Sequence, residues 1–162
     1  MTWIRNLLPN PLLILPSSNI TTVQCKVQHF APDQIAITPS SGAQNPYAKL
    51  NLNATYSGSF HLELHVGPVA QGSEFADYLV WLNYTDSSGK GFKLPDSMSS
   101  GMNFIGWDFD TASLKSIQLQ PPKNHQLVFS AINLMLESEW QQYKKLVDSK
   151  HPLHGGLMPL AS

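Results

Sequence analysis

Residues 107–136 read WDFDTASLKSIQLQPPKNHQLVFSAINLML. This stretch predicts two short strands, Leu114–Gln120 and Gln126–Leu136, joined by a Pro-Pro-Lys-Asn turn. The two prolines cannot donate hydrogen bonds to a sheet ladder, so they end the first strand, and the asparagine favours the turn. Such a pair of strands is typical of the closing part of a β-sandwich. No residue cluster within it specifies a reaction.

Period-two patterning predicts further strands between residues 21 and 94. They are Thr21–Phe30, Gln34–Thr38, Tyr47–Thr55, Ser59–Val66, Ala76–Tyr84 and Phe92–Leu94. The third and fourth are expected to form a hairpin, and the fifth is apolar on both faces, which favours a central position in its sheet. Together these strands predict an all-β fold, an antiparallel two-sheet β-sandwich with jelly-roll-like connections.

The apolar period changes after the last strand. Apolar residues at positions 136, 140, 143, 146 and 147 predict one C-terminal amphipathic helix over Leu136–Lys150. At the other end, three prolines interrupt the apolar stretch MTWIRNLLPNPLLILPSS, which argues against a signal peptide and favours an extended arm that docks on this domain or a neighbour. We therefore expect an arm over residues 1–18, a sandwich over residues 19–136, and a helix and tail over residues 137–162.

Composition excludes several classes of function. The 162 residues suffice for one domain with a proper core. The formal net charge is −1 and charged residues make up 13%, about half the usual share, so the chain lacks the clustered cations that nucleic-acid binding requires. The single cysteine, Cys25, excludes an internal disulfide and a cysteine-rich zinc site. No segment approaches the roughly 20 apolar residues of a membrane span.

A polar strip is expected on one face of the hairpin. It consists of Lys49, Asn51, Asn53, His61, Glu63 and His65. With Trp81 as an aromatic surface, these residues are candidates for binding a sugar, because polar side chains satisfy hydroxyl groups while sugar C–H faces stack on rings. The alternative is that the strip is simply a solvated sheet face, and that the aromatic rings belong to the core.

Within this strip, His61, Glu63 and His65 could also bind a metal. Alternate residues of a strand point the same way about 7 Å apart, so two imidazoles and a carboxylate can converge on zinc or non-haem iron. A further histidine ligand from the β region would have to be His125.

Three stretches share an order of strands, Gly-rich or Pro-rich turns and aromatic residues: 35–52 (IAITPSSGAQNPYAKLNL), 79–93 (LVWLNYTDSSGKGFK) and 114–136 (LKSIQLQPPKNHQLVFSAINLML). This order resembles the galactose-binding-like jelly rolls, which include carbohydrate-binding modules and domains appended to bacterial polysaccharide proteins. Gln120 departs from the family, where an Asp often precedes the turn proline, and so do the helix and tail. The resemblance implies a non-catalytic role in glycan recognition or as a scaffold. It also implies a structural calcium, for which Asp108 and Asp110 are candidates.

The sequence contains no recognised nucleophile motif and no phosphate-binding loop, so we expect a protein that is not an enzyme. The first hypothesis is a β-sandwich that binds a neutral glycan. The second is a structural subunit of a homo-oligomer or larger assembly, which would dock on protein neighbours through its arm and helix. The third is a small metalloenzyme that uses His61, Glu63 and His65. No segment indicates the compartment.

Overall fold

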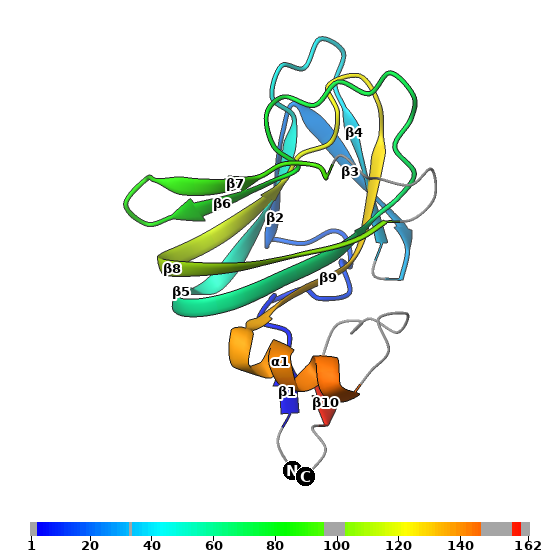
Figure 1. The fold of residues 1–162 in the computed structure, drawn as a ribbon. Helices are drawn as coiled ribbons and strands as arrows, with labels where there is room; N and C mark the ends of the chain where they lie inside the picture. The colour runs from blue at the N-terminus through cyan, green and yellow to red at the C-terminus, as the bar shows by residue number, and fades with distance from the viewer. Residues whose placement is uncertain (1–2, 33, 96–102, 147–156, 160–162) are drawn as a thin grey trace.

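The computed structural model describes residues 3–32, 34–95, 103–146 and 157–159 (Figure 1). Its elements in chain order are β1 (Trp3–Arg5), β2 (Ile20–Val23), β3 (Cys25–Ala31), β4 (Gln34–Pro39), β5 (Tyr47–Val66), β6 (Val80–Tyr84), β7 (Gly89–Phe92), β8 (Asn103–Leu119), β9 (Leu127–Leu136), α1 (Glu137–Leu146) and β10 (Leu157–Pro159). No helix in this part of the chain has the length and apolar character needed to cross a bilayer.

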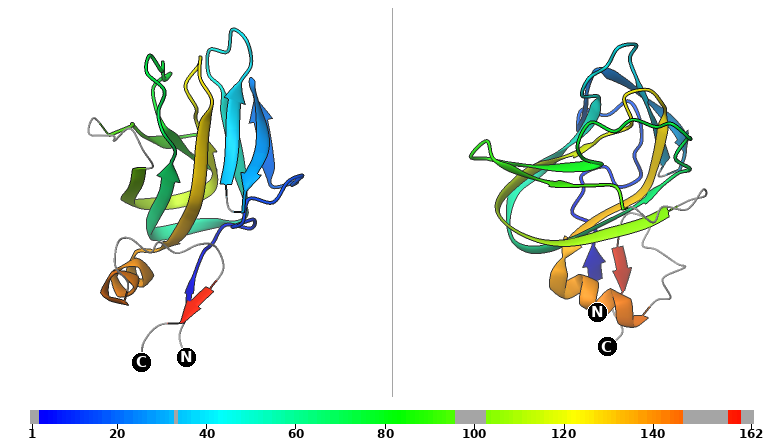
Figure 2. Two further views of the ribbon diagram at one scale, coloured as in Figure 1. Left: turned by 90° about the vertical axis from the view of Figure 1, so that its right-hand side faces the viewer. Right: turned by 45° about the horizontal axis from the view of Figure 1, so that its top comes forward.

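Eight strands form one antiparallel sheet in the order β3-β4-β9-β5-β8-β6-β7, with β2 paired to β5. The first part of β5 pairs with β2 and its second part pairs with β9, while β8 runs along both parts. The sheet therefore bends along β5 into two layers around a common core (Figures 1 and 2). The predicted antiparallel β-sandwich with one helix is confirmed.

Strand alternation fills the core. In the second part of β5, Phe60, Leu62, Leu64 and Val66 are all almost completely buried. Phe109 of β8 stacks on Phe60 with ring centroids 5.9 Å apart. Burial of each such side chain contributes about 1.5–3 kcal/mol, so the inward-facing rows of β5, β8 and β9 supply much of the stability.

The expected hairpin over residues 47–66 is instead a single strand of 20 residues. Its pairing with β8 shifts register between Asn51 and Gly58, where the hairpin turn was predicted. Because β8 lies alongside both halves, the extra residues are accommodated as bulges and the chain continues in the same direction.

The closing strands also differ from the prediction. The expected strand Leu114–Gln120 is the end of β8, which has 17 residues and pairs with β5 and β6 rather than with β9. The expected strand Ala76–Tyr84 is shorter, because β6 begins only at Val80. The expected strand Thr21–Phe30 is divided into β2 and β3 at Gln24, whose φ of 52° interrupts the extended backbone.

The N-terminal arm lies against the protein's own sandwich. Leu7, Leu8 and Leu13 are buried in the core, whereas Leu12 and Ile14 are exposed. Next to them the buried Asn6 side chain hydrogen-bonds the outer edge of β9. β1 pairs with β10, so segments from the two ends of the chain lie side by side (Figure 2).

The C-terminal helix packs on the outer side of the sheet formed by β5 and β9 (Figure 1). Of its predicted apolar stripe, Tyr143 is buried and Trp140 half-buried. Glu137 and Glu139 lie in its first turn, and Lys144 and Lys145 in its last, which complements the helix dipole. Residues 147–150 of the expected helix, and the tail apart from β10, lie outside the described residues.

Cys25 begins β3 and is buried, and its thiol donates a hydrogen bond to the Tyr47 carbonyl oxygen at 3.2 Å. Burial raises the pKa of this thiol above its ordinary value, although hydrogen bonds with the backbone partly offset the effect. Because the thiolate is the nucleophile, we expect Cys25 in the native protein to react with iodoacetamide at pH 7.5 at least about tenfold more slowly than in guanidinium chloride. Mass spectrometry over time measures both rates; equal rates would contradict the buried position.

Candidate functional site

A row of aligned residues crosses the outer face of the sheet in the half where β8 pairs with both β5 and β6. The register aligns Lys49 of β5 with Gln118 of β8, then Trp81 of β6 and Gly91 of β7. On each strand the next residue points to the opposite, inner face. There Leu50, Ile117 and Leu82 are buried. The core therefore determines which side chains this outer face presents.

A groove with a volume of about 400 Å³ lies on this face. It is lined by Asn45, Tyr47, Asp77, Tyr78, Trp81, Gln118 and Gln120. Tyr78 and Trp81 contact each other with ring centroids 5.2 Å apart and planes inclined by 47°. The volume falls within the range of roughly 300–1,000 Å³ that is usual for small-molecule sites.

Two glycines of β7 make room for the aromatic rings of the groove. A Cβ atom at Gly91 would lie 2.3 Å from the Tyr78 ring, and one at Gly89 would lie 2.6 Å from the Trp81 ring. Any larger residue at either position would push the ring from its place. The ring positions therefore depend on the absence of side chains from the neighbouring strand.

Amide groups form a short network along the floor of the groove. Gln118 Nε2 donates to Asn83 Oδ1 at 3.3 Å, and Gln120 Nε2 donates to Gln118 Oε1 at 3.4 Å. Next to them, Ser116 Oγ and Asn83 Nδ2 are buried and have no hydrogen-bond partner among the described residues. Buried polar atoms are normally hydrogen-bonded, but these two lie beneath the surface and neither residue lines the groove, so they are not counted among its ligand-binding groups.

The predicted polar strip is divided between two environments. Trp81 lines the groove, and Lys49 and Asn51 lie on the same sheet face in register with Gln118 and Ser116. Asn53 is exposed, and its Oδ1 accepts a hydrogen bond from Asn19.

The histidine end of the strip is not on an open surface as expected, because α1 covers the outer face of the second half of β5. His61 is 5% exposed and Glu63 is 0% exposed. His65 is half-buried, and its ring makes an edge contact with Phe104. These three side chains therefore cannot extend the open groove.

Several groove residues were not predicted as ligands. Alternation in the expected strand Ala76–Tyr84 would place Tyr78 and Trp81 on opposite faces. Tyr78 instead precedes β6, so strand alternation does not apply to it. Asn45 and Asp77 also come from loops, where no regular spacing of apolar residues predicts the direction of a side chain. Gln118 and Gln120 did carry a signal, since they alternate with apolar residues at the end of β8.

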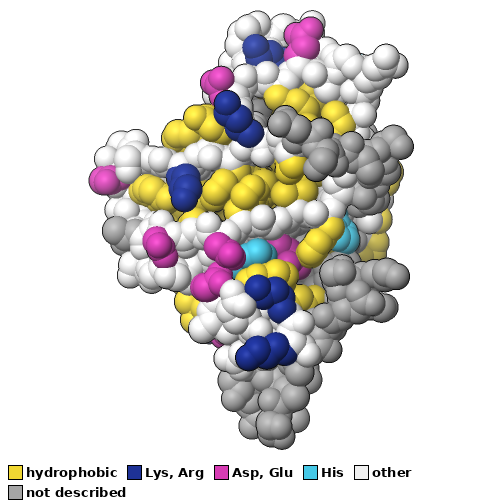
Figure 3. Space-filling view, viewed as in Figure 1, with side chains coloured by type: hydrophobic (Ala, Val, Ile, Leu, Met, Phe, Trp, Pro, Cys, Tyr) yellow, Lys and Arg dark blue, Asp and Glu magenta, His cyan; other side chains and the backbone are white. Residues whose placement is uncertain are grey.

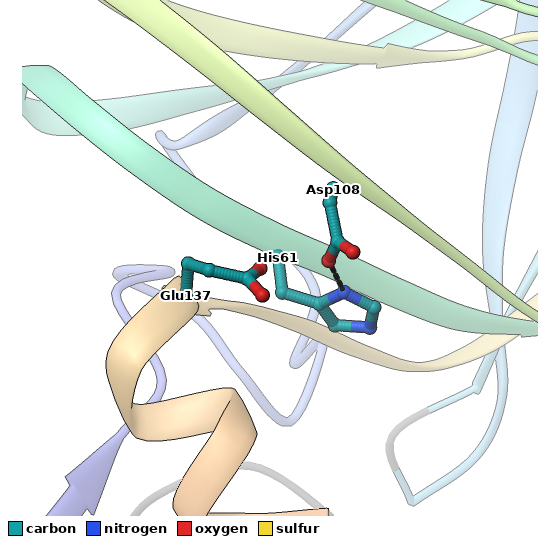
Figure 4. A group of neighbouring side chains, drawn as sticks. All are labelled: His61, Asp108 and Glu137. Carbon is teal, nitrogen blue, oxygen red and sulfur yellow. Dashed lines mark hydrogen bonds and ion pairs between the residues drawn. The ribbon is translucent and has the colours of Figure 1, made fainter.

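A second polar group lies beneath α1 (Figure 4). His61 Nδ1 is 2.6 Å from Asp108 Oδ1, and His61 Nε2 is 3.5 Å from Glu63 Oε2. The His61 ring stacks on Trp140 with centroids 3.8 Å apart and planes 3° from parallel. The ligand atoms of His61, Asp108 and Glu137 all lie within 4.8 Å of one another, so this structure brings together a different metal-ligand group from the predicted His61, Glu63 and His65.

The charge state of Asp108 follows from these neighbours. Partial burial raises the pKa of Asp108, but its interactions with His61, Glu137 and Lys144 lower it more, so the net shift is downward. Asp108 is therefore a carboxylate at neutral pH. The other predicted calcium candidate, Asp110, accepts a hydrogen bond from Ser59 at 2.5 Å.

Comparisons with known proteins bear on the fold. No protein-family model and no curated protein matches the sequence. Among solved structures, a mutant of a family 29 carbohydrate-binding module is similar, with 14% identity, 83% of this chain and 89% of that chain covered, and a TM-score of 0.55. The enzymatically active domain of tailspike protein 4 from bacteriophage CBA120 has 12% identity over 81% of this chain and 21% of that chain, with a TM-score of 0.56. An exo-β-agarase has 7% identity over 84% and 26%, with a TM-score of 0.54.

At these identities the similarity establishes the β-sandwich fold alone. It confirms the fold that the sequence resemblance implied, because a carbohydrate-binding module is matched along most of both chains. The tailspike and agarase matches cover about a quarter or less of those longer chains, so in them the similar part is one portion of a larger protein.

Proposed function

We propose that this protein is a non-catalytic β-sandwich module that binds a neutral carbohydrate in the groove defined by Tyr78, Trp81 and Gln118. The observation that carries the proposal is the combination of aromatic rings and amide side chains around one groove of about 400 Å³. Aromatic rings offer apolar area to the C–H face of a sugar ring, while amides supply both donors and acceptors for its hydroxyl groups.

The charge of the groove favours a neutral ligand. Asp77 is the one charged residue among those that line it, and Lys49 lies in the neighbouring row of the same face. One acid and one base leave no excess of either sign.

The similar structures support the same class of ligand. One is named as a carbohydrate-binding module and another as an agarase. Both names refer to those proteins, and they support the proposal because the shared sandwich presents a sheet face on which such ligands can be bound.

The second hypothesis, a structural subunit, keeps one specific observation in its favour. Leu12 is 46% exposed and Ile14 is 59% exposed on the arm, although their neighbour Leu13 is completely buried. These two apolar side chains would suit contact with a protein neighbour. Light scattering on the intact chain distinguishes a monomer from an assembly.

A glycan array probed with the purified chain tests the proposal, and Gln118→Ala tests the site. Loss of this amide is expected to weaken binding of the retained glycan about fivefold to tenfold, because it removes a hydrogen-bonding group from a desolvated contact. Gln126→Ala is the matched control, since Gln126 is exposed and contacts Thr38 outside the groove. Retention of no glycan at millimolar concentration would overturn the proposal, and an equal effect of both substitutions would overturn the site.

A further inference from the structure

Three side chains beneath α1 have the donor types and the positions of metal ligands. His61 comes from β5, Asp108 from β8 and Glu137 from the first turn of α1. Their ligand atoms lie within 4.8 Å of one another (Figure 4). Three elements that are distant in sequence therefore bring one imidazole and two carboxyl groups close together.

The two carboxyl groups need a positive species between them. A carboxyl oxygen of Asp108 lies within 4.8 Å of one of Glu137, and two carboxylates this close repel each other unless a proton or a cation lies between them. Glu137 Oε1 accepts a hydrogen bond from Gln141, whereas Glu137 Oε2 is buried and has no hydrogen-bond partner among the described residues. One carboxylate oxygen of Glu137 is thus left for a ligand.

The charges around the group are unbalanced. Three carboxyl groups, those of Glu63, Asp108 and Glu137, surround one imidazole, and Lys144 adds one ammonium charge. Carboxyl groups therefore outnumber basic groups around His61, which favours a cation at this place. Figure 3 shows acidic side chains gathered around a histidine on this face, above α1.

The surroundings of His61 also match those of a metal ligand. A ligating histidine usually donates its second ring N–H to a carboxylate, which fixes the ring and increases its basicity. Here Nδ1 lies 2.6 Å from Asp108 Oδ1, while Nε2 lies 3.5 Å from the buried Glu63 carboxylate and forms no hydrogen bond among the described residues, so it must move slightly closer to donate to Glu63. Trp140 holds one face of the ring, and Gly106 leaves space for its edge, since a Cβ atom there would lie 2.8 Å from Nε2.

We propose that His61 Nδ1, Asp108 and Glu137 bind one zinc ion, with Glu63 as the hydrogen-bond acceptor for His61 Nε2. Zinc takes histidine nitrogen and carboxylate oxygen at about 2.0–2.2 Å, whereas calcium prefers six to eight oxygen ligands, which this mixed set does not supply. Three protein ligands leave the fourth position to solvent. The ion would join α1 to β5 and β8.

Little movement is needed to complete this geometry. Tetrahedral bonds of about 2.05 Å place ligand atoms about 3.3 Å apart, so the 2.6 Å contact between His61 and Asp108 must open slightly and ligand atoms that lie up to 4.8 Å apart must approach each other. The Asp108 side chain is 60% exposed and has room to rotate. The site is separate from the glycan groove, so each proposal can fail without the other.

Isothermal titration of the chelator-treated, full-length protein with zinc chloride tests the site. We expect one ion per chain at micromolar concentration, and a rise in Tm of about 3–8 °C when zinc replaces the chelator. Glu137→Gln and Asp108→Asn should each weaken zinc binding at least about 100-fold, because each removes a direct ligand. Both are conservative changes, and their melting curves in chelator show whether they fold.

Asp110→Asn is the matched control, because Asp110 lies two residues from Asp108 on the same strand and is bonded to Ser59. It should bind zinc as the unmodified chain does. Absence of zinc binding would overturn the proposal. Binding that persists in both Glu137→Gln and Asp108→Asn would also overturn it, since the ion would then be held by other histidines.

Discussion

Replacing Asn6 by alanine is expected to lower the free energy of unfolding by about 2–4 kcal/mol. Asn6 Nδ2 donates to the Ile132 carbonyl and to Asn133 Oδ1, and Asn6 Oδ1 accepts hydrogen bonds from the backbone N–H groups of Leu8 and Leu134. All these groups are buried, and an unsatisfied buried polar group costs about 1–3 kcal/mol. The Asn6 side chain thus takes the place of a neighbouring strand beside residues 132–134 of β9, which lie beyond the part of β9 that pairs with β4. Urea denaturation followed by tryptophan fluorescence measures the change.

Asn10→Ala is the control for this prediction. Asn10 forms two comparable hydrogen bonds with the backbone of Ile14, but it does so in an exposed turn of the same arm. Water can replace these bonds, so the expected loss stays within about 1 kcal/mol. Equal losses for the two variants would show that Asn6 does not hold the arm on the sandwich.

Replacing Trp81 by alanine is expected to weaken glycan binding by about 30-fold or more. Trp81 lies in the groove against Tyr78, and its ring is held over Gly89. Removal of such an aromatic anchor costs about 2 kcal/mol or more, because the apolar face on which the ligand stacks is lost. Titration with the glycan retained on the array measures the change, and Trp81→Phe should keep most of the affinity.

Trp107→Ala separates a loss of binding from a loss of stability. Trp107 stacks on Phe92 with ring centroids 4.9 Å apart. Both rings are partly buried against the hydrophobic core and do not line the groove. This variant should unfold at a lower temperature and still bind the glycan. If Trp81→Ala and Trp107→Ala reduced binding equally, the groove would not be the binding site.

Much of the fold could be predicted because strand alternation is a local signal. The inward-facing residues of β5 and β8 were recognisable because every second residue is apolar. The C-terminal helix was recognisable because its apolar residues are spaced three or four apart. The hairpin was predicted wrongly, because Tyr56-Ser-Gly-Ser has turn-forming residues but lies opposite a strand that keeps it extended. Local turn preference was outweighed by pairing with residues that lie about 50–60 positions later.

The candidate site could be predicted only in part. Trp81, Lys49 and Asn51 lie in or beside the groove, but Tyr78 and Asp77 enter it from a loop for which periodicity gives no orientation. Glu137 has no recognisable ligand motif around it, because nothing near it in sequence indicates that it lies beside His61 and Asp108.

The order of apolar and polar residues along each strand determined which face would turn to the core, since a strand with alternating side chains can bury only one of its sides. It placed Asn51 and His61 on the same outer face. The docking of α1 then divided that face, leaving Asn51 beside an open groove and burying His61 under Trp140. Such docking depends on contacts between segments that are far apart in the chain, and no short-range pattern records them.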